Sequence, residues 1–286
     1  MAAVINTNLA SLNAQRNLTT SQSSLNSSLQ RLSSGLRVNS AKDDAAGLSI
    51  ATRMDAQVRG QTVAIRNAND AISLAQTAEG ALGKITDALQ RMRELAVQSA
   101  NATNEEGDRD NLQAEFKQLQ DEITRITAGT KFNNKALFTG SSGLTFQVGA
   151  GTTSQDTITV DAINLTSAAT GSTSGVAAAA ATGTVAISGA SADNATAAID
   201  AIDDALDAVN TSRATLGAVQ NRFESVISSL QVSVENQSAA KSRILDADFA
   251  AETANLTRAQ ILQQAGTAML AQANSVPNNV LTLLRG

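Results

Sequence analysis

The sequence predicts a mainly α-helical fold, in which long antiparallel helices form a coiled-coil-like bundle with a small β-hairpin region in the middle of the chain. Three patterns support this prediction. Leucine and isoleucine recur at helical spacing in residues 1–42 and 241–286, which indicates long helices at both ends. A seam of apolar residues at steps of three and four then continues for about four heptads. Beyond Gly140 the apolar period changes to two, which is typical of strands.

The first periodic segment places its large apolar residues on one face of a helix. These residues are Ile5, Leu9, Leu12, Leu18, Leu25, Leu29, Leu32 and Leu36. Gly35 and the pair Asn39 and Ser40 interrupt the pattern. Asp43 and Asp44 follow, where the positive N-terminal end of a new helix favours acidic side chains. We therefore expect a break between two packing regions here.

The next helix carries the most regular apolar seam of the chain. The seam contains Ile65, Ala68, Ile72, Ala75, Ala78, Leu82, Ile85, Leu89, Met92 and Ala96. Thr103 and Glu106 then match a capping box, which predicts the start of another helix that ends at Gly129. Two antiparallel helices joined by a short turn follow from this order.

The middle of the chain has a different pattern. Apolar and polar residues alternate around Phe146 and again around Val160, which predicts a β-hairpin across a Gly/Thr/Ser loop. Residues 166–195 are of low complexity, with one weak strand expected around Val185 and Ile187. Helical spacing then returns and continues to the last segment, where the only proline, Pro277, is expected to end the helix.

The composition argues against most enzyme chemistries. The 286 residues include no His and no Cys, which removes the commonest general base, the commonest metal ligand and all disulfides. Paired carboxylates such as Asp43 and Asp44 or Asp203 and Asp204 lack a basic partner in the sequence pattern, so helix-start charges and solvated faces explain them better. We expect no catalytic, cofactor-binding or metal-binding residues.

The charge pattern and the hydropathy limit the possible partners. The net charge is -5, and the few basic residues of the first 42 positions are dispersed without Trp or Tyr, so no nucleic-acid partner is expected. No apolar run approaches membrane-spanning length, so membrane insertion is not expected. The start, Met1 to Asn6, lacks the basic and apolar regions of a secretory signal peptide. If the protein is exported, we expect the export route to recognise a different signal.

The terminal segments need partners in order to fold. Burying the apolar residues of one striped helix does not offset the conformational entropy lost in ordering its backbone. Pairing the two ends with each other still leaves much apolar surface exposed. We therefore predict that the ends are disordered in the monomer and become helical on assembly. A head-to-tail contact that does not close would then give a filament.

Long blocks at both ends resemble bacterial flagellins. The first blocks read INTNLASLNAQRNL, SSLQRLSSGLRVNSAKDDAAGLSIATRM and LQRMRELAVQSANATN, and the last reads SRILDADFAAETANLTRAQILQQAGTAMLAQANSVPNNVLTLLRG. The resemblance implies an exported structural subunit of the extracellular flagellar filament, which serves swimming motility. It implies that residues 1–42 with 243–286 form the inner tube, that 43–139 with 196–242 form a helical bundle in the outer tube, and that 140–195 form a variable surface region.

The same resemblance implies partners and sites. The implied partners are further copies of the chain, a flagellar export chaperone, the filament cap and junction proteins, and the vertebrate toll-like receptor for flagellin, with export through the flagellar type III apparatus. Arg91, Leu95 and Glu115 match the receptor segment, and Arg91 and Leu95 are expected on one exposed face. Alternatively, all three residues pack against neighbouring subunits. Filament packing is expected from Leu9, Leu12, Leu29, Leu32, Leu256, Leu262, Met269, Leu281 and Leu284.

Two other functions remain compatible with these patterns. A flagellar hook-filament junction protein shares similar ends but would not extend a filament by itself. A coiled-coil binding module unrelated to motility would share only the helical seams. Seeded polymerisation distinguishes these alternatives, because a flagellin should extend filament fragments with copies of itself alone.

Overall fold

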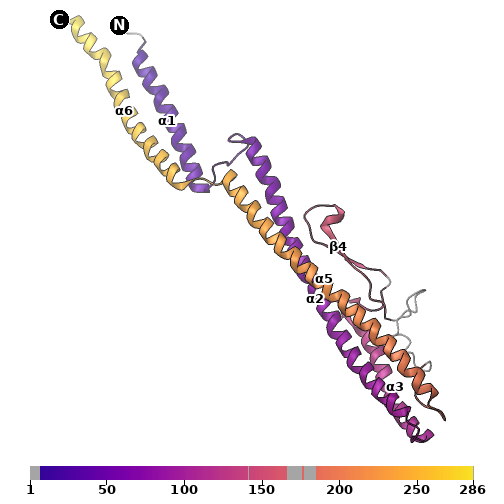
Figure 1. Ribbon diagram of the computed structural model, residues 1–286. Helices are drawn as coiled ribbons and strands as arrows, with labels where there is room; N and C mark the ends of the chain where they lie inside the picture. The colour runs from indigo at the N-terminus through magenta and orange to yellow at the C-terminus, as the bar shows by residue number, and fades with distance from the viewer. Residues whose placement is uncertain (1–6, 141, 166–175, 177–184, 286) are drawn as a thin grey trace. The chain divides into compact units, whose positions relative to one another are not determined.

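The computed structural model describes residues 7–140, 142–165, 176 and 185–285, with side chains described up to residue 275 (Figure 1). The chain divides into two compact units. Unit 1 comprises Met1–Val58 with Glu235–Gly286, and unit 2 comprises Arg59–Val234. Helices α2 (Ala45–Ser99) and α5 (Asp193–Leu245) each contribute to both units.

Unit 1 pairs the two ends of the chain. Helix α1 (Leu9–Ser34) and helix α6 (Phe249–Arg285) lie side by side (Figure 1). Asn8 caps the N-terminus of α1, and Gly35 ends it in the left-handed conformation, with φ of 71°. Gly35 suits this position because a residue without Cβ adopts positive φ without strain.

The backbone leaves the helical conformation after α1 and again after α5, and hydrogen bonds join these two non-helical segments. The backbone N–H of Arg37 donates to Leu245 O at 2.6 Å, and that of Ala247 donates to Gly35 O at 2.9 Å. Beyond the first break, Asp44 accepts a hydrogen bond from the N–H of Gly47 in the first turn of α2. The helix therefore breaks where Gly35 and the two aspartates indicate, but the residues on both sides of this break belong to unit 1, which extends to Val58.

The expectation that Pro277 ends the last helix is wrong. Helix α6 continues through this residue to Arg285. Proline fixes φ near the helical value, so its cost in a helix interior comes from the missing N–H and from its ring. The N–H that is missing here would have bonded Ala273 O, which instead accepts a hydrogen bond from the side chain of Asn8.

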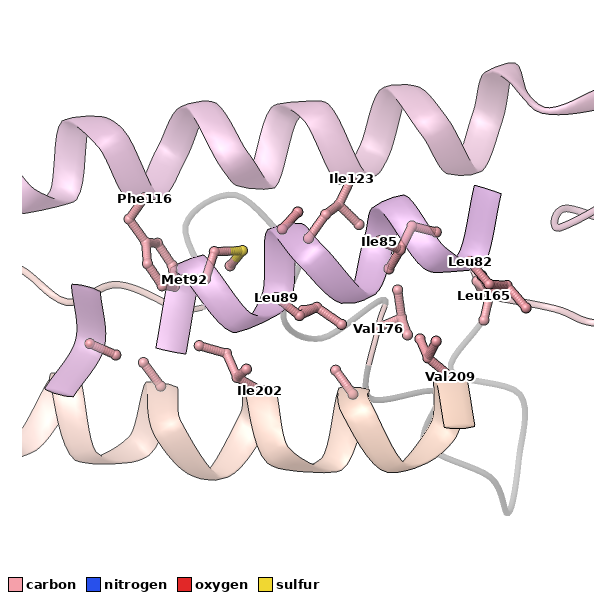
Figure 2. Close-up of a cluster of buried hydrophobic side chains, with 14 of the residues drawn as sticks. Leu82, Ile85, Leu89, Met92, Phe116, Ile123, Leu165, Val176, Ile202 and Val209 are labelled. Atoms are coloured by element: carbon pink, nitrogen blue, oxygen red, sulfur yellow. The ribbon is translucent and has the colours of Figure 1, made fainter. Parts of the chain in front are cut away.

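Unit 2 packs α3 (Glu106–Gly129) against parts of α2 and α5 around an apolar core (Figure 2). Leu82, Ile85, Leu89 and Met92 come from α2, Phe116 and Ile123 from α3, and Ile202 and Val209 from α5. The start of α3 differs from the prediction, because Glu105 and Asp108 form the capping box. The displacement is two residues along the chain, and an acidic N-cap suits the helix dipole as well as Thr103 would.

Among the described residues between α3 and α5, two short hairpins are present. The predicted hairpin pairs β3 (Leu144–Gln147) with β4 (Thr157–Val160) in antiparallel register, with a one-turn 3-10 helix at Ser154–Asp156 between them. Phe146 of β3 meets Phe223 of α5 edge to face, with ring centroids 5.7 Å apart. This aromatic contact lies in a second apolar cluster that covers α2 and α5.

The sequence did not predict the other hairpin, β1 (Lys131–Phe132) with β2 (Lys135–Ala136). Its turn residues Asn133 and Asn134 have φ of 47° and 63°. Asparagine tolerates this left-handed conformation, so an Asn–Asn pair can form a tight hairpin turn. The strands are too short for an alternating apolar pattern to reveal them.

Of the weak strand expected around Val185 and Ile187, the structure has a single β-bridge residue at Val185, and polar side chains hold the backbone of residues 185–189. Ser99 Oγ donates to Ile187 O at 2.6 Å, and Gln113 Oε1 accepts from Ile187 N at 2.6 Å. Gln120 Nε2 donates to Val185 O at 3.0 Å, and buried Arg109 donates to Gly189 O at 3.1 Å. Side chains of α2 and α3 therefore hold the backbone of this segment in place.

Candidate assembly and recognition surfaces

The contact between α1 and α6 buries few large side chains. Leu25 and Ala259 are the buried apolar residues of this pair among those the structure describes, and Ser11, Ser28 and Glu252 are buried beside them. Polar bonds cross the seam as well, including one from Gln263 Nε2 to Gln22 Oε1 at 2.8 Å. The seam is thus narrow and partly polar, unlike the core of unit 2.

Most large apolar residues of these two helices face away from the seam. Leu9, Leu12, Leu29, Leu262 and Met269 have exposed fractions between 47% and 70%. Leu32 and Leu256 are half-buried. Leu281 and Leu284 lie beyond the residues whose side chains the structure describes. The structure therefore places the exposed members of the predicted packing set where another chain can reach them.

Two further residues belong to this apolar surface but were not predicted. Phe249 is 56% exposed at the start of α6, and Ile261 is 60% exposed beside Leu262. The adjacent pair Ile261 and Leu262 could have signalled this, because neighbouring residues on a helix cannot both lie in a narrow seam. An apolar surface this rich is the mark of a surface that other chains cover.

Of the receptor-segment residues, the structure brings two together at the surface. Arg91 Nε donates to Glu115 Oε1 at 2.8 Å across α2 and α3, and Arg91 Nη1 donates to Glu94 Oε2 at 2.9 Å. These hydrogen bonds, first that to Glu115, raise the pKa of Arg91 above its ordinary value. The three side chains form an exposed charged cluster on unit 2.

Leu95 does not share this exposed face, so that part of the prediction is wrong. Its side chain is 1% exposed and belongs to the core of unit 2. The prediction assumed that α2 packs against one helix and therefore buries only a narrow apolar stripe. Because α2 packs against both α3 and α5, its buried stripe is wider and takes in Leu95 next to Ala96.

The acidic pairs have structural partners in the chain. Asp43 accepts hydrogen bonds from Ser40 Oγ and from the N–H groups of Ser40 and Asn39, and these bonds, first that from the Ser40 hydroxyl, lower the pKa of Asp43. Across the residues that the structure describes, no group of three or more Asp and Glu residues is arranged to hold a metal ion. Within the same residues, no helix has the length and apolarity needed to cross a membrane.

The fold and these surfaces define a helical structural subunit whose paired terminal helices expose apolar side chains. Residues 5–143 match the model of the bacterial flagellin N-terminal helical region, and residues 199–284 match that of the C-terminal helical region. The chain belongs to the bacterial flagellin family. It is a subunit of the flagellar filament, and it polymerises with copies of itself.

Full-length relatives support this assignment. The chain is 47% identical to a flagellin of Halalkalibacterium halodurans over 282 residues, covering 99% of this chain and 100% of the relative. It is 46% identical to a flagellin of Xenorhabdus nematophila over 315 residues, with 100% of both chains covered. A Bacillus subtilis flagellin is 42% identical over 303 residues, covering 98% of this chain and 99% of the relative.

Solved structures include a Bacillus cereus flagellin, 34% identical with a TM-score of 0.48, covering 62% of this chain and 94% of that one. A putative flagellar hook-associated protein from Vibrio parahaemolyticus has a TM-score of 0.59 at 16% identity, covering 71% of this chain and 100% of that one. The second likeness shows a shared fold alone. Because the full-length relatives are flagellins, the hook-filament junction alternative is not favoured, nor is a coiled-coil module unrelated to motility.

Proposed function

We propose that this subunit is exported through the flagellar type III apparatus and adds to the extracellular filament for swimming, and that neighbouring copies complete the burial of its terminal helices. The observation that carries the proposal is the outward position of Leu9, Leu12, Leu262 and Met269 on the α1–α6 pair. Covering these side chains supplies the free energy that the narrow seam lacks. The terminal helices accordingly order when the subunit joins the filament. The role is structural, without catalysis.

The resemblance to flagellins divides the chain within the filament at bounds that differ from those of units 1 and 2. Residues 1–42 with 243–286 would line the inner tube, where apolar helix faces are covered on several sides. Residues 43–139 with 196–242 would form the outer tube, supported by the well-filled core of unit 2. Residues 140–195, which include the β3–β4 hairpin, would form the variable outward surface.

The partners proposed besides sister subunits are an export chaperone, the filament cap and the junction proteins. Each would meet the chain at its terminal helices before or after assembly. The exposed apolar residues of α6, such as Ile261 and Met269, are the kind of surface that a chaperone covers during export. A pull-down that compares the full chain with one lacking residues 249–286 tests this.

A second proposed role is recognition by the toll-like receptor for flagellin. The supporting observation is the exposed cluster in which Arg91 bonds Glu115. These two side chains can exchange their mutual bonds for bonds to a receptor, while buried Leu95 positions α2 beneath them. Arg91→Ala and Glu115→Ala should each weaken receptor activation by monomers, with Lys117→Ala on the same helix as an exposed control. Unchanged activation by both variants would contradict this role.

Seeded growth tests the assembly proposal. Purified chain added to short filament fragments should extend them without any other protein, and circular dichroism should show a rise in helix content as it does so. A chain trimmed of residues 1–34 should not extend the fragments. If the trimmed chain grows equally long filaments, or if helix content stays constant during growth, the proposed ordering of the ends is wrong.

A further inference from the structure

The side chain of Asn8 bonds to both terminal helices. Its Oδ1 accepts a hydrogen bond from the backbone N–H of Ser11 at 3.1 Å and so caps the first turn of α1. Its Nδ2 donates to the carbonyl oxygen of Ala273 on α6 at 2.8 Å. One amide group therefore uses its acceptor on its own helix and its donor on the opposite helix.

The carbonyl that Asn8 binds is one that α6 cannot satisfy by itself. In an α-helix the N–H of residue i donates to the carbonyl of residue i−4, so the natural donor to Ala273 O is residue 277. That residue is proline, which has no N–H. Because the helix continues past it to Arg285, Pro277 leaves an acceptor open in the helix interior. The Asn8 amide fills this vacancy.

A neighbouring contact supports the same alignment. Buried Ser11 lies with its Oγ 2.8 Å from Asn274 Oδ1, one residue beyond the open carbonyl. The rest of the seam contains small or flexible residues such as Ala259 and Gln263, together with buried Leu25 and a 3.9 Å ion pair between Arg31 and Glu252. In paired helices, a polar group at one core position can specify the register.

We propose that Asn8 and Pro277 together set the register of α1 against α6 in the assembled subunit. The proline marks one position along α6 with an open carbonyl, and the Asn8 amide recognises that position. A slide by one helical turn would leave Ala273 O without its donor and place the Asn8 amide against carbonyls that are already bonded. The proposal rests on the proposed pairing of the ends within the filament, and its tests are separable from that pairing.

A double-mutant cycle measures the link between the two residues. Asn8→Ser keeps an N-cap hydroxyl but is too short to reach α6, and Pro277→Ala restores the missing N–H. Losing one hydrogen bond to a group that is then left unpaired should raise the critical concentration for polymerisation by about 2- to 10-fold. In the Pro277→Ala background the same substitution should change it by less than about 2-fold, because the restored helix bond already satisfies Ala273 O. Equal effects in both backgrounds would overturn the proposal.

A cross-linking experiment reads the register directly. The chain has no cysteine, so a pair introduced as Gln22→Cys and Gln263→Cys, whose side chains touch across the seam, reports the observed alignment. Oxidised filaments should cross-link this pair efficiently. With Asn8→Ser added, part of the cross-linking should move to Gln22→Cys with Thr267→Cys, one turn along α6. An unchanged cross-linking pattern would overturn the proposal even if Pro277→Ala fails to polymerise.

Two controls separate this proposal from the assembly proposal. Asn17→Ser replaces an exposed asparagine on α1 and should leave both the critical concentration and the cross-linking pattern unchanged. If the chain with native Asn8 and Pro277 fails to extend seeds, the proposed function fails. If it extends seeds and Asn8→Ser behaves like Asn17→Ser, only the register proposal fails.

Discussion

Arg93 on α2 and Asp203 on α5 form a two-pronged ion pair in unit 2. Arg93 Nε lies 2.7 Å from Asp203 Oδ1, and Arg93 Nη2 lies 3.1 Å from Asp203 Oδ2. This parallel geometry is the one that a guanidinium and a carboxylate favour. The hydrogen bonds from Arg93 hold the pKa of Asp203 below its ordinary value. The pair therefore ties two helices together beside the core residue Ile202.

This lowered pKa predicts a pH-dependent contribution to stability. Since the folded state favours the ionised Asp203, the contribution is fully present above the ordinary pKa of 3.8 and is lost as the pH falls through the lowered pKa of the folded state. Asp203→Asn should thus give a small drop in the thermal midpoint of the monomer at neutral pH, and no drop in strong acid. The drop stays small because both side chains are about half exposed.

Thermal unfolding followed by circular dichroism at a series of pH values checks this. Asp204→Asn, an exposed neighbour on the same helix, is the matched control and should leave the midpoint unchanged. A difference between Asp203→Asn and the parent chain that persists unchanged into strong acid would show that the carboxylate charge is not the cause.

The apolar period explains why the helices could be predicted from sequence. Steps of three and four continue wherever a helix buries a stripe, and Gly35 marks a break because its backbone conformation suits few other residues. The period of two located β3 and β4 for the same reason. The end predicted at Pro277 was wrong. The carbonyl of Ala273, which lacks a donor because of Pro277, accepts a hydrogen bond from Asn8, 269 positions before the proline, and such a long-range partner leaves no local signal in the sequence.

The surfaces were predictable only in part. The number of leucines at the two ends indicated more apolar residues than one pair of helices can bury, and Leu9, Leu12 and Met269 are indeed exposed on the α1–α6 pair. Which residue of a stripe is buried depends on how many helices surround it. Leu95 is buried because α2 has two helical neighbours in unit 2, and the number of neighbouring helices cannot be predicted from the local sequence.

Exposed apolar residues of α6 should matter for polymerisation and not for the monomer. Leu262→Ser and Met269→Ser remove side chains that are 51% and 64% exposed, so the thermal midpoint of the monomer should not change. Burial of such a side chain by a neighbouring subunit contributes about 1.5–3 kcal/mol, so each substitution should raise the critical concentration about 10-fold or more.

Ile202→Ala is the opposite case and serves as the comparison. Its side chain is fully buried in unit 2, and the cavity should lower the free energy of unfolding of the monomer by about 2–5 kcal/mol. Urea unfolding of monomers and sedimentation of filaments measure the two quantities. If Leu262→Ser and Met269→Ser destabilise the monomer as much as Ile202→Ala does, these residues stabilise the single chain and not the filament.

Arg109 should hold the segment at 185–189 through its backbone. Its Nε donates to Ser99 O and its Nη1 donates to Gly189 O, each at 3.1 Å, while the side chain is 5% exposed. Arg109→Met would leave both carbonyls without this donor and should cost about 1–3 kcal/mol of unfolding free energy. Amides near Ile187 should exchange with deuterium faster, because their anchor has weakened.

Lys117→Met is the matched control for this prediction, since Lys117 is an exposed cation on the same helix. It should change neither the unfolding free energy nor the exchange near Ile187. Equal exchange in Arg109→Met and the parent chain would show that Ser99, Gln113 and Gln120 hold the segment without help from the arginine.

Gly35 should be needed for the turn that follows α1. Its φ of 71° lies in the left-handed region, where a residue with a Cβ is strained by about 1–2 kcal/mol. A Cβ at this position would meet the ring of Phe249 at 3.9 Å, which is an ordinary contact, so the expected cost comes from the backbone alone. Gly35→Ala should therefore raise the critical concentration for polymerisation by about 5- to 30-fold, and Gly35→Asn should raise it less because asparagine tolerates this conformation.

Gly80→Ala, in the interior of α2 with open space around the new methyl, should instead stabilise the monomer. Sedimentation of filaments and urea unfolding of monomers distinguish the outcomes, and a Gly35→Ala chain that polymerises as well as Gly35→Asn would show that the left-handed turn is not required.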